Sequence, residues 1–143
     1  MPKIERKIEI NASSKKVWEA TSDIENIPKW NISIKEIKEL EPDKYSVKST
    51  MGDYTSTNTE RIENKKTTSK VDHPEFTGYG FILNEKDDIT ELSYWVDVPM
   101  ITREKIQARS LEITLKNIKH FVEYLEDGGD PDEYDRRQIL VKP

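Results

Sequence analysis

Hydrophobic and polar residues alternate through most of this chain. In Lys3–Ile10, Ile4, Ile8 and Ile10 share one face and charged residues take the other, which is typical of a half-buried strand. Six further segments have strand-like alternation or a high content of β-branched residues: 32–40, 45–51, 54–63, 67–73, 77–84 and 89–98. The spacing of apolar residues changes after Ile34, which predicts a bulge or bend there.

Two short helices are expected between the first strand and the second. Ser13 or Ser14 can accept a hydrogen bond from the free N–H groups at the start of the first helix. Asp23 can cap the second helix in the same way, and Pro28 keeps that helix short or irregular. The side chains that these helices are expected to bury are Val17, Trp18, Thr21, Ile24, Ile27 and Trp30.

A long amphipathic stretch, Thr102–Leu125, follows the last strand and ends before Gly128 and Gly129. Thr102 is its expected N-cap. At helical spacing one apolar stripe contains Ala108, Leu111, Leu115, Ile118, Val122 and Leu125. One long helix after a run of consecutive strands predicts an α+β fold, with the helix packed on one antiparallel sheet.

The length of 143 residues suits one domain. We expect residues 1–126 to form that domain and residues 127–143 to form an acidic link and a C-terminal tail. Asp127–Glu133 is acidic and turn-rich, as flexible links are. Ile139–Val141 is a small apolar cluster that could dock on the domain or on a partner, although termini more often fray.

Composition limits the classes of partner. The net charge is −5 and basic residues are interspersed with acidic ones, so a nucleic-acid-binding surface is not expected. The chain has no cysteine, which excludes disulfides, thiol catalysis and zinc–thiolate sites. No apolar run approaches the ~20 residues of a membrane span, and the N-terminus lacks a signal-peptide core. We therefore expect a soluble cytoplasmic protein, a monomer or homodimer, with no cofactor.

Two groups of residues carry a resemblance to a known family. The first comprises Ile8–Ala20, which includes the Val17-Trp18 pair, followed by Ser22-Asp23-Ile24 and Pro28-Lys29-Trp30; the second is Ser93–Pro99, which leads into the long helix. Together they resemble the START-like (SRPBCC, birch-pollen-allergen-like) superfamily, which includes polyketide cyclases/dehydrases and lipid-transfer domains. The resemblance covers roughly residues 3–126. It implies the helix-grip fold, a curved antiparallel sheet wrapped around a long C-terminal helix, with a cavity between them.

If the fold is correct, a polar seam and an apolar wall meet at that cavity. The expected wall residues are Leu92, Tyr94 and Val96 from the last strand, with Trp30 near the mouth. The seam on the helix consists of Arg103, Gln107, Ser110 and Thr114, at spacings of four, three and four. Arg103 is the natural partner for a carboxylate. The alternative, which the pattern favours, is that the seam is merely the border between the buried and wet faces of the helix. Trp18 is favoured as a core residue, whereas Trp30 and Tyr94 could be either core residues or ligand contacts.

Other polar and aromatic residues leave alternatives open. The hydroxyl-rich strand Tyr54–Thr59 either lines the cavity or is an outer strand with no role in binding. His73 could act as an acid or base, but its position before Pro74 favours an exposed loop. His120 is expected on the surface, and two separated histidines make a metal site improbable. Trp95 is expected on the outer face of the sheet, as an exposed interface residue or beneath the C-terminal tail.

Three functions are compatible with these patterns. The first is a carrier or sensor that binds a small hydrophobic or amphipathic molecule, such as a lipid, isoprenoid, polyketide-like or aromatic metabolite, in an internal cavity. The second is a cyclase/dehydrase-type enzyme with His73, Tyr94 and Arg103 as candidate groups. The third is an interaction module that uses Trp95, the C-terminal tail and the outer flank of the helix, with Ile106, Ile113 and Tyr124. We rank them in that order.

Overall fold

The computed structural model describes residues 3–50, 52–74, 76–98 and 104–137. It opens with strand β1 (Lys3–Ile10) and two short helices, α1 (Ser14–Ser22) and α2 (Ile27–Trp30). Six strands follow: β2 (Ile34–Glu41), β3 (Lys44–Ser49), β4 (Tyr54–Ile62), β5 (Lys66–Val71), β6 (Gly78–Lys86) and β7 (Ile89–Asp97). The long helix α3 (Glu104–Glu126) and a 3-10 turn, η2 (Pro131–Glu133), complete it.

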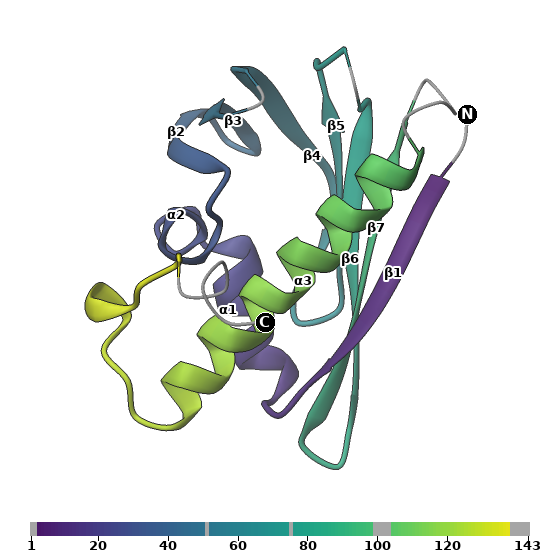
Figure 1. The fold of residues 1–143 in the computed structure, drawn as a ribbon. Helices are drawn as coiled ribbons and strands as arrows, with labels where there is room; N and C mark the ends of the chain where they lie inside the picture. The colour runs from purple at the N-terminus through teal and green to yellow at the C-terminus, as the bar shows by residue number, and fades with distance from the viewer. Residues whose placement is uncertain (1–2, 51, 75, 99–103, 138–143) are drawn as a thin grey trace.

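All seven strands form one antiparallel sheet in the order β1-β7-β6-β5-β4-β3-β2. The sheet curves around α3, and α1 and α2 lie beside the lower half of that helix (Figure 1). The α+β fold with a helix-grip arrangement is therefore confirmed. The predicted bend in β2 is also confirmed, because the pairing of β2 with β3 shifts register between Ile34 and Glu36.

The starts of the two short helices differ from each other. The Ser13 hydroxyl accepts a hydrogen bond from the Lys16 N–H at 3.4 Å, so Ser13 caps α1 as predicted. Asp23 does not cap α2, whose N-cap is Asn26 with no side-chain hydrogen bond. Instead the Asp23 carboxylate accepts from the Glu25 N–H at 3.0 Å and stabilises the turn between the helices.

The core lies between the concave face of the sheet and the helices α1 and α3. The apolar stripe of α3 faces it as predicted: Ala108, Leu111, Leu115, Ile118 and Val122 are buried, and Leu125 is partly buried. Phe121 is also fully buried in this core. Leu92 and Trp18 belong to the same cluster, so Trp18 is a core residue, as the sequence favoured.

Trp95 lies on the outer face of the sheet, opposite in direction to Tyr94. It is not exposed, however: only 8% of the residue is accessible. Its ring lies against Gly80, where a Cβ atom would come within 2.6 Å of the ring, and the Lys3 ammonium lies 4.4 Å from the ring centroid. The expectation of an exposed tryptophan is therefore wrong, because a glycine on the neighbouring strand makes room for the ring and a lysine covers it.

The segment after α3 is folded onto the domain rather than forming a loose link. We call residues 127–137 the C-terminal strap. The strap turns back from the end of α3 through η2 towards α2 (Figure 1). The Tyr124 hydroxyl donates to the Asp130 carbonyl at 2.8 Å, so Tyr124 supports the strap instead of forming an open outer flank. The apolar cluster Ile139–Val141 lies outside the described residues.

Candidate functional site

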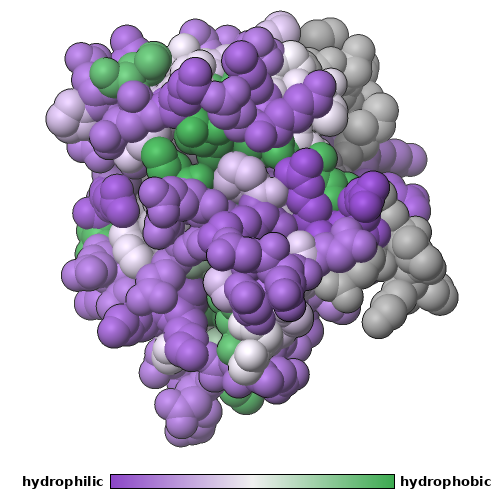
Figure 2. All heavy atoms as spheres, turned by 90° about the vertical axis from the view of Figure 1, so that its left-hand side faces the viewer, coloured by the Kyte–Doolittle hydropathy of each residue, from purple (hydrophilic) through white to green (hydrophobic). Residues whose placement is uncertain are grey.

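A cavity of about 110 Å³ lies between α3, the concave face of the sheet and the corner where α2 meets β2. On the face that carries α2 and β2, apolar surface is recessed between polar rims (Figure 2). Three kinds of residue line the cavity: aromatic (Trp30, Tyr54, Phe76, Tyr79, Phe81, Tyr94), aliphatic (Ile27, Ile34, Ile37, Val47, Val96, Leu111) and polar (Thr21, Asn31, Ser33, Ser49, Gln107, Ser110, Thr114).

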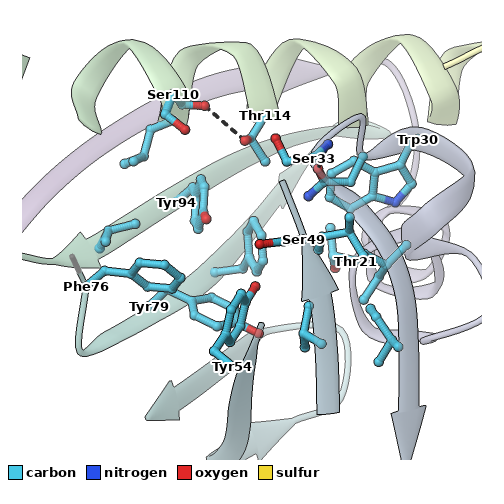
Figure 3. A pocket seen from close by; sticks show the side chains of 18 of the residues that line it. Thr21, Trp30, Ser33, Ser49, Tyr54, Phe76, Tyr79, Tyr94, Ser110 and Thr114 are labelled. Atoms are coloured by element: carbon cyan, nitrogen blue, oxygen red, sulfur yellow. Dashed lines mark hydrogen bonds between the residues drawn. The ribbon is translucent and has the colours of Figure 1, made fainter. Parts of the chain in front are cut away.

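The periodicities of a strand and of a helix determine which side chains point into the cavity. Tyr94 and Val96 point inward from β7 because they are two residues apart on one strand. Gln107, Ser110 and Thr114 point inward from α3 because spacings of three and four keep them on one helical face. Ser110 and Thr114 face three tyrosine rings across the cavity (Figure 3).

Six of the eight residues that the sequence analysis assigned to a ligand site therefore line one cavity: Trp30, Tyr94, Val96, Gln107, Ser110 and Thr114. Leu92 does not line it. It is fully buried in the core cluster, together with Val17 and Ile118. Arg103 lies outside the described residues, so its role as an anion partner stays a prediction.

The aromatic wall is preorganised. The rings of Phe81 and Tyr94 stack with their centroids 4.5 Å apart and an interplanar angle of 14°. The Tyr79 ring meets both edge-on, at 6.3 and 6.4 Å. Such contacts stabilise an aromatic pair beyond the burial of its area, so they hold the wall in one arrangement.

A hydrogen bond from its indole N–H holds Trp30 in the cavity wall. The indole N–H donates to the Ala20 carbonyl at 2.8 Å, and only 2% of the residue is accessible. It is thus both a buried core residue and a lining residue. Its polar atom is used within the protein, so Trp30 offers a ligand its apolar face alone.

On the sheet side of the cavity, tyrosine hydroxyls provide polar groups. Burial raises the pKa of Tyr94 well above its ordinary value, and the neighbouring Tyr79 adds to the effect. Burial likewise raises the pKa of Tyr54, with contributions from Tyr79 and Tyr94. Both phenols therefore keep their protons at neutral pH and can donate a hydrogen bond. The Tyr79 hydroxyl already lies 3.3 Å from the hydroxyl of Ser56.

The helix side offers weaker donors and acceptors. The Thr114 hydroxyl donates to the Ser110 carbonyl at 2.9 Å, which leaves its oxygen free to accept (Figure 3). Gln107 is buried, with 6% of the residue accessible. No charged side chain lines this cavity among the residues that the structure describes. The described part of the site therefore suits an uncharged ligand.

The position of β4 shows which of the two alternatives for this hydroxyl-rich strand holds. The strand lies within the sheet between β3 and β5, and alternate residues point inward. Tyr54 lines the main cavity, while Ser56 and Asn58 line an adjoining pocket of about 50 Å³ that shares Tyr79 and Phe81 with it. The hydroxyl-rich strand is thus part of the cavity region, as one of the two open alternatives held.

The expectation that His73 is exposed is wrong. Only 8% of the residue is accessible, and its ring stacks on Phe76 with the centroids 4.8 Å apart. The ring also meets Tyr54 edge-on at 5.8 Å, so His73 packs behind a lining residue rather than lining the cavity. His120 is exposed, as predicted. Across the described ranges, no three histidine, aspartate or glutamate side chains are placed to hold a metal ion.

Sequence reasoning missed the lining residues of β6 and of the α2–β2 corner. Tyr79 and Phe81 alternate on one strand, and that signal was visible in the sequence. Asn31 and Ser33 had no such signal, because the irregular connection between α2 and β2 positions them. None of the described helices is long and apolar enough to cross a membrane.

Comparisons with known proteins agree with this architecture. A family model described as "Polyketide cyclase / dehydrase and lipid transport" matches residues 1–81. No curated protein matches the chain. A START superfamily protein from Mycobacterium smegmatis is similar in structure, with a TM-score of 0.75, 22% identity, and coverage of 86% of this chain and 98% of that protein.

Two further solved structures have the same fold. The Aha1 dimer from Colwellia psychrerythraea has a TM-score of 0.73 and 18% identity over 86% of this chain and 97% of its own. CalU16 from Micromonospora echinospora has a TM-score of 0.70 and 18% identity over 84% of this chain and 75% of its own. At these identities the likeness describes the fold.

Proposed function

This chain belongs to the polyketide cyclase / dehydrase and lipid transport family, and from that premise we propose that it binds a small uncharged molecule in the cavity beneath α3. The observation that carries the proposal is the chemistry of the cavity wall: aromatic and aliphatic side chains with a few hydroxyl and amide groups, and no charge among its described residues. Ligand sites generally combine apolar walls with a few polar groups in this way.

The size of the cavity narrows the ligand class. An apolar cavity of about 150 Å³ accommodates benzene, so a cavity of about 110 Å³ is close to the size that one ring needs. A larger ligand has to extend through the mouth or into the adjoining pocket of about 50 Å³. We therefore favour a ligand with a ring-sized apolar part over a lipid that is buried along its whole length.

The polar groups favour a hydrogen-bond acceptor on that ring. Tyr54 and Tyr94 retain their protons, so each has an O–H to donate. A carbonyl or ether oxygen accepts such a bond without carrying a charge into a site where the described residues supply no counter-charge. The favoured ligand is thus a neutral aromatic or cyclic compound with an acceptor oxygen.

Binding is placed ahead of catalysis because the two candidate acid–base groups that the structure describes, Tyr94 and His73, do not converge on the cavity. Of the three named from the sequence, Tyr94 lines the cavity, while His73 packs behind Tyr54. A phenol with a raised pKa stays protonated at neutral pH, so it is not available as a base and serves as a hydrogen-bond donor.

Three single-ring compounds test the proposal: acetophenone, toluene and benzoate. Titrations followed by protein NMR should give the tightest binding for acetophenone, with a Kd in the range of roughly 0.1–1 mM for a ligand of this size. Toluene lacks the acceptor and should bind more weakly, and benzoate carries a charge and should bind least. Shifts confined to residues outside the cavity, or preferred binding of benzoate, would count against it.

A matched pair of variants on α3 provides the control. Ser110→Leu places a larger side chain in the cavity and should abolish acetophenone binding. Arg109→Leu makes a substitution to the same residue at the exposed neighbouring position and should leave binding unchanged. Equal binding by both variants would show that the compounds do not occupy this cavity.

A further inference from the structure

The C-terminal strap connects the far end of α3 to the mouth of the cavity. The strap is held to α3 by Tyr134, whose ring centroid lies 5.1 Å from that of Phe121 and 5.1 Å from that of Tyr124. Two residues further on, Arg136 reaches the corner where α2 meets β2. The strap therefore joins the C-terminal end of α3 to a segment that lies about one hundred residues earlier in the sequence.

Arg136 makes an unusual concentration of hydrogen bonds at this corner. Its Nη1 donates to the carbonyl oxygens of Pro28 at 2.7 Å, Asn31 at 2.9 Å and Ile34 at 2.7 Å. Hydrogen bonds from a charged donor are stronger than neutral ones, and this guanidinium is partly buried, so water competes less for it. A salt bridge between Lys29 and Asp132, at 3.3 Å, also links the strap to α2. Because Asp132 is largely exposed, this salt bridge contributes little to holding the strap in place.

The three carbonyls belong to residues 28–34, a segment that lines the cavity on the face where apolar surface is recessed between polar rims (Figure 2). Trp30, Asn31, Ser33 and Ile34 all line the cavity. Two of the bonds from Arg136 fall on lining residues, Asn31 and Ile34, and the third falls on Pro28, two residues before Trp30. The sheet side restrains this corner through the pairing of Ile34 with Ser49 and through a hydrogen bond from the Thr50 N–H to the Ser33 carbonyl at 2.8 Å. β2 is the last strand in the sheet order and pairs on one side only, with β3, and its pairing is already irregular next to Ile34.

We propose that the C-terminal strap controls access to the cavity, with Arg136 as the positioning residue that holds the α2–β2 corner closed over it. Breaking the three bonds frees the corner while the core between α3 and the sheet stays packed. The consequence is faster exchange of a ligand between the cavity and solvent. This regulation concerns the same site as the proposed function and rests on that function for its ligand.

The test compares Arg136→Gln with Arg137→Gln. Arg137 is the exposed neighbour, paired with Asp135 at 3.6 Å, and it makes no contact with the corner in the described structure, so it is the matched control. In Arg136→Gln, backbone hydrogen exchange across residues 27–34 should rise by roughly tenfold or more, since one charge-assisted hydrogen bond already accounts for that factor. Exchange in β6 and β7 should not change in either variant.

Ligand kinetics supply the second readout. Acetophenone should dissociate roughly tenfold faster from Arg136→Gln than from Arg137→Gln, as measured by NMR line shapes. Arg136→Lys retains the charge with a different geometry and should be intermediate. Unchanged exchange across residues 27–34 would overturn the proposal. If hydrogen exchange across residues 27–34 rose but the dissociation rate of acetophenone did not change, the strap would not control access to the cavity.

A wrong ligand class and a strap that does not control access would give different results. If acetophenone binds neither variant, the proposed ligand class is wrong. The indole N–H of Trp30 then reports on access, because Trp30 lines the cavity and its N–H is bonded to Ala20. Faster solvent exchange of that N–H in Arg136→Gln alone would support control of access by the strap, and equal exchange in both variants would refute it.

Discussion

Alkaline pH should destabilise this protein through the two buried phenols of the cavity. Burial raises the pKa of Tyr94 and of Tyr54 in the folded state, with smaller contributions from neighbouring tyrosines. In the unfolded chain each phenol ionises at its ordinary pKa of about 10. The unfolded state therefore releases protons that the folded state retains, and the free energy of unfolding falls as the pH rises above about 10.

The size of the effect follows from linkage. For one phenol that stays protonated in the folded state, the loss of stability is about 1.4 kcal/mol at pH 11 and increases by about 1.4 kcal/mol for each further pH unit. Tyr54 and Tyr94 together should remove about 2.8 kcal/mol at pH 11, which is a large part of a total stability of about 5–15 kcal/mol. Below about pH 9 this contribution to stability is fully present.

Urea unfolding from pH 8 to pH 11, followed by circular dichroism, measures the slope. Tyr94→Phe removes one of the two groups, so its loss of stability between pH 8 and pH 11 should be about 1.4 kcal/mol smaller than that of the wild type. Lysines that also titrate in this range are common to both proteins and cancel in the difference. Identical slopes, or ionisation of Tyr94 near pH 10 in the folded protein by ultraviolet absorbance, would refute the reasoning.

Three further substitutions test the packing and hydrogen bonds of the fold by urea unfolding. Gly80→Ala should cost about 2–3 kcal/mol, because its Cβ would lie 2.6 Å from the ring of Trp95, whereas Gly78→Ala, with its nearest atom at 3.0 Å, should cost less. Burial raises the pKa of Glu123, but the hydrogen bond from the Asn11 N–H and the attraction of a nearby lysine outweigh it and lower the pKa. Glu123→Gln should therefore cost about 1 kcal/mol at pH 7, and the cost should disappear as the pH falls through that pKa. Trp30→Phe should cost about 1–2 kcal/mol, because the carbonyl that accepts from its indole N–H loses its partner.

Periodicity was sufficient to predict the strands, the helices and the α+β class, because burial and side-chain direction depend on it directly, whereas the helix-grip arrangement was implied by the family resemblance. The isoleucines of β1 alternate with charged residues, and Ala108, Leu111 and Leu115 recur at helical spacing on α3. The same regularity predicted that Tyr94 and Val96 share a face and that Ser110 and Thr114 share another. Six of the eight expected site residues were consequently brought to one cavity.

The errors fall where a residue's surroundings depend on a distant segment. His73 precedes a proline at a strand end, which favours exposure, yet its ring packs edge-on against Tyr54, which the distant strand β4 supplies, as well as on the nearby Phe76. Trp95 is buried because Gly80 on the adjacent strand has no side chain, a match between two strands that neither sequence pattern reveals. Arg136 lies in a polar segment with no periodicity, and only the folded chain brings it to three carbonyls near α2.

The cavity exists because the two halves of α3 carry different residues on the face towards the sheet. Leu115, Ile118 and Val122 fill the space above the core completely, whereas Gln107, Ser110 and Thr114 include short or polar side chains that leave space over the tyrosines. An interior normally packs to high density, and larger apolar residues at these positions would bury more surface and stabilise the fold. A chain that keeps serine and threonine there forgoes that stability. Such a loss is expected where the space itself is used, and this is the strongest reason to regard the N-terminal half of α3 as the binding half of the helix.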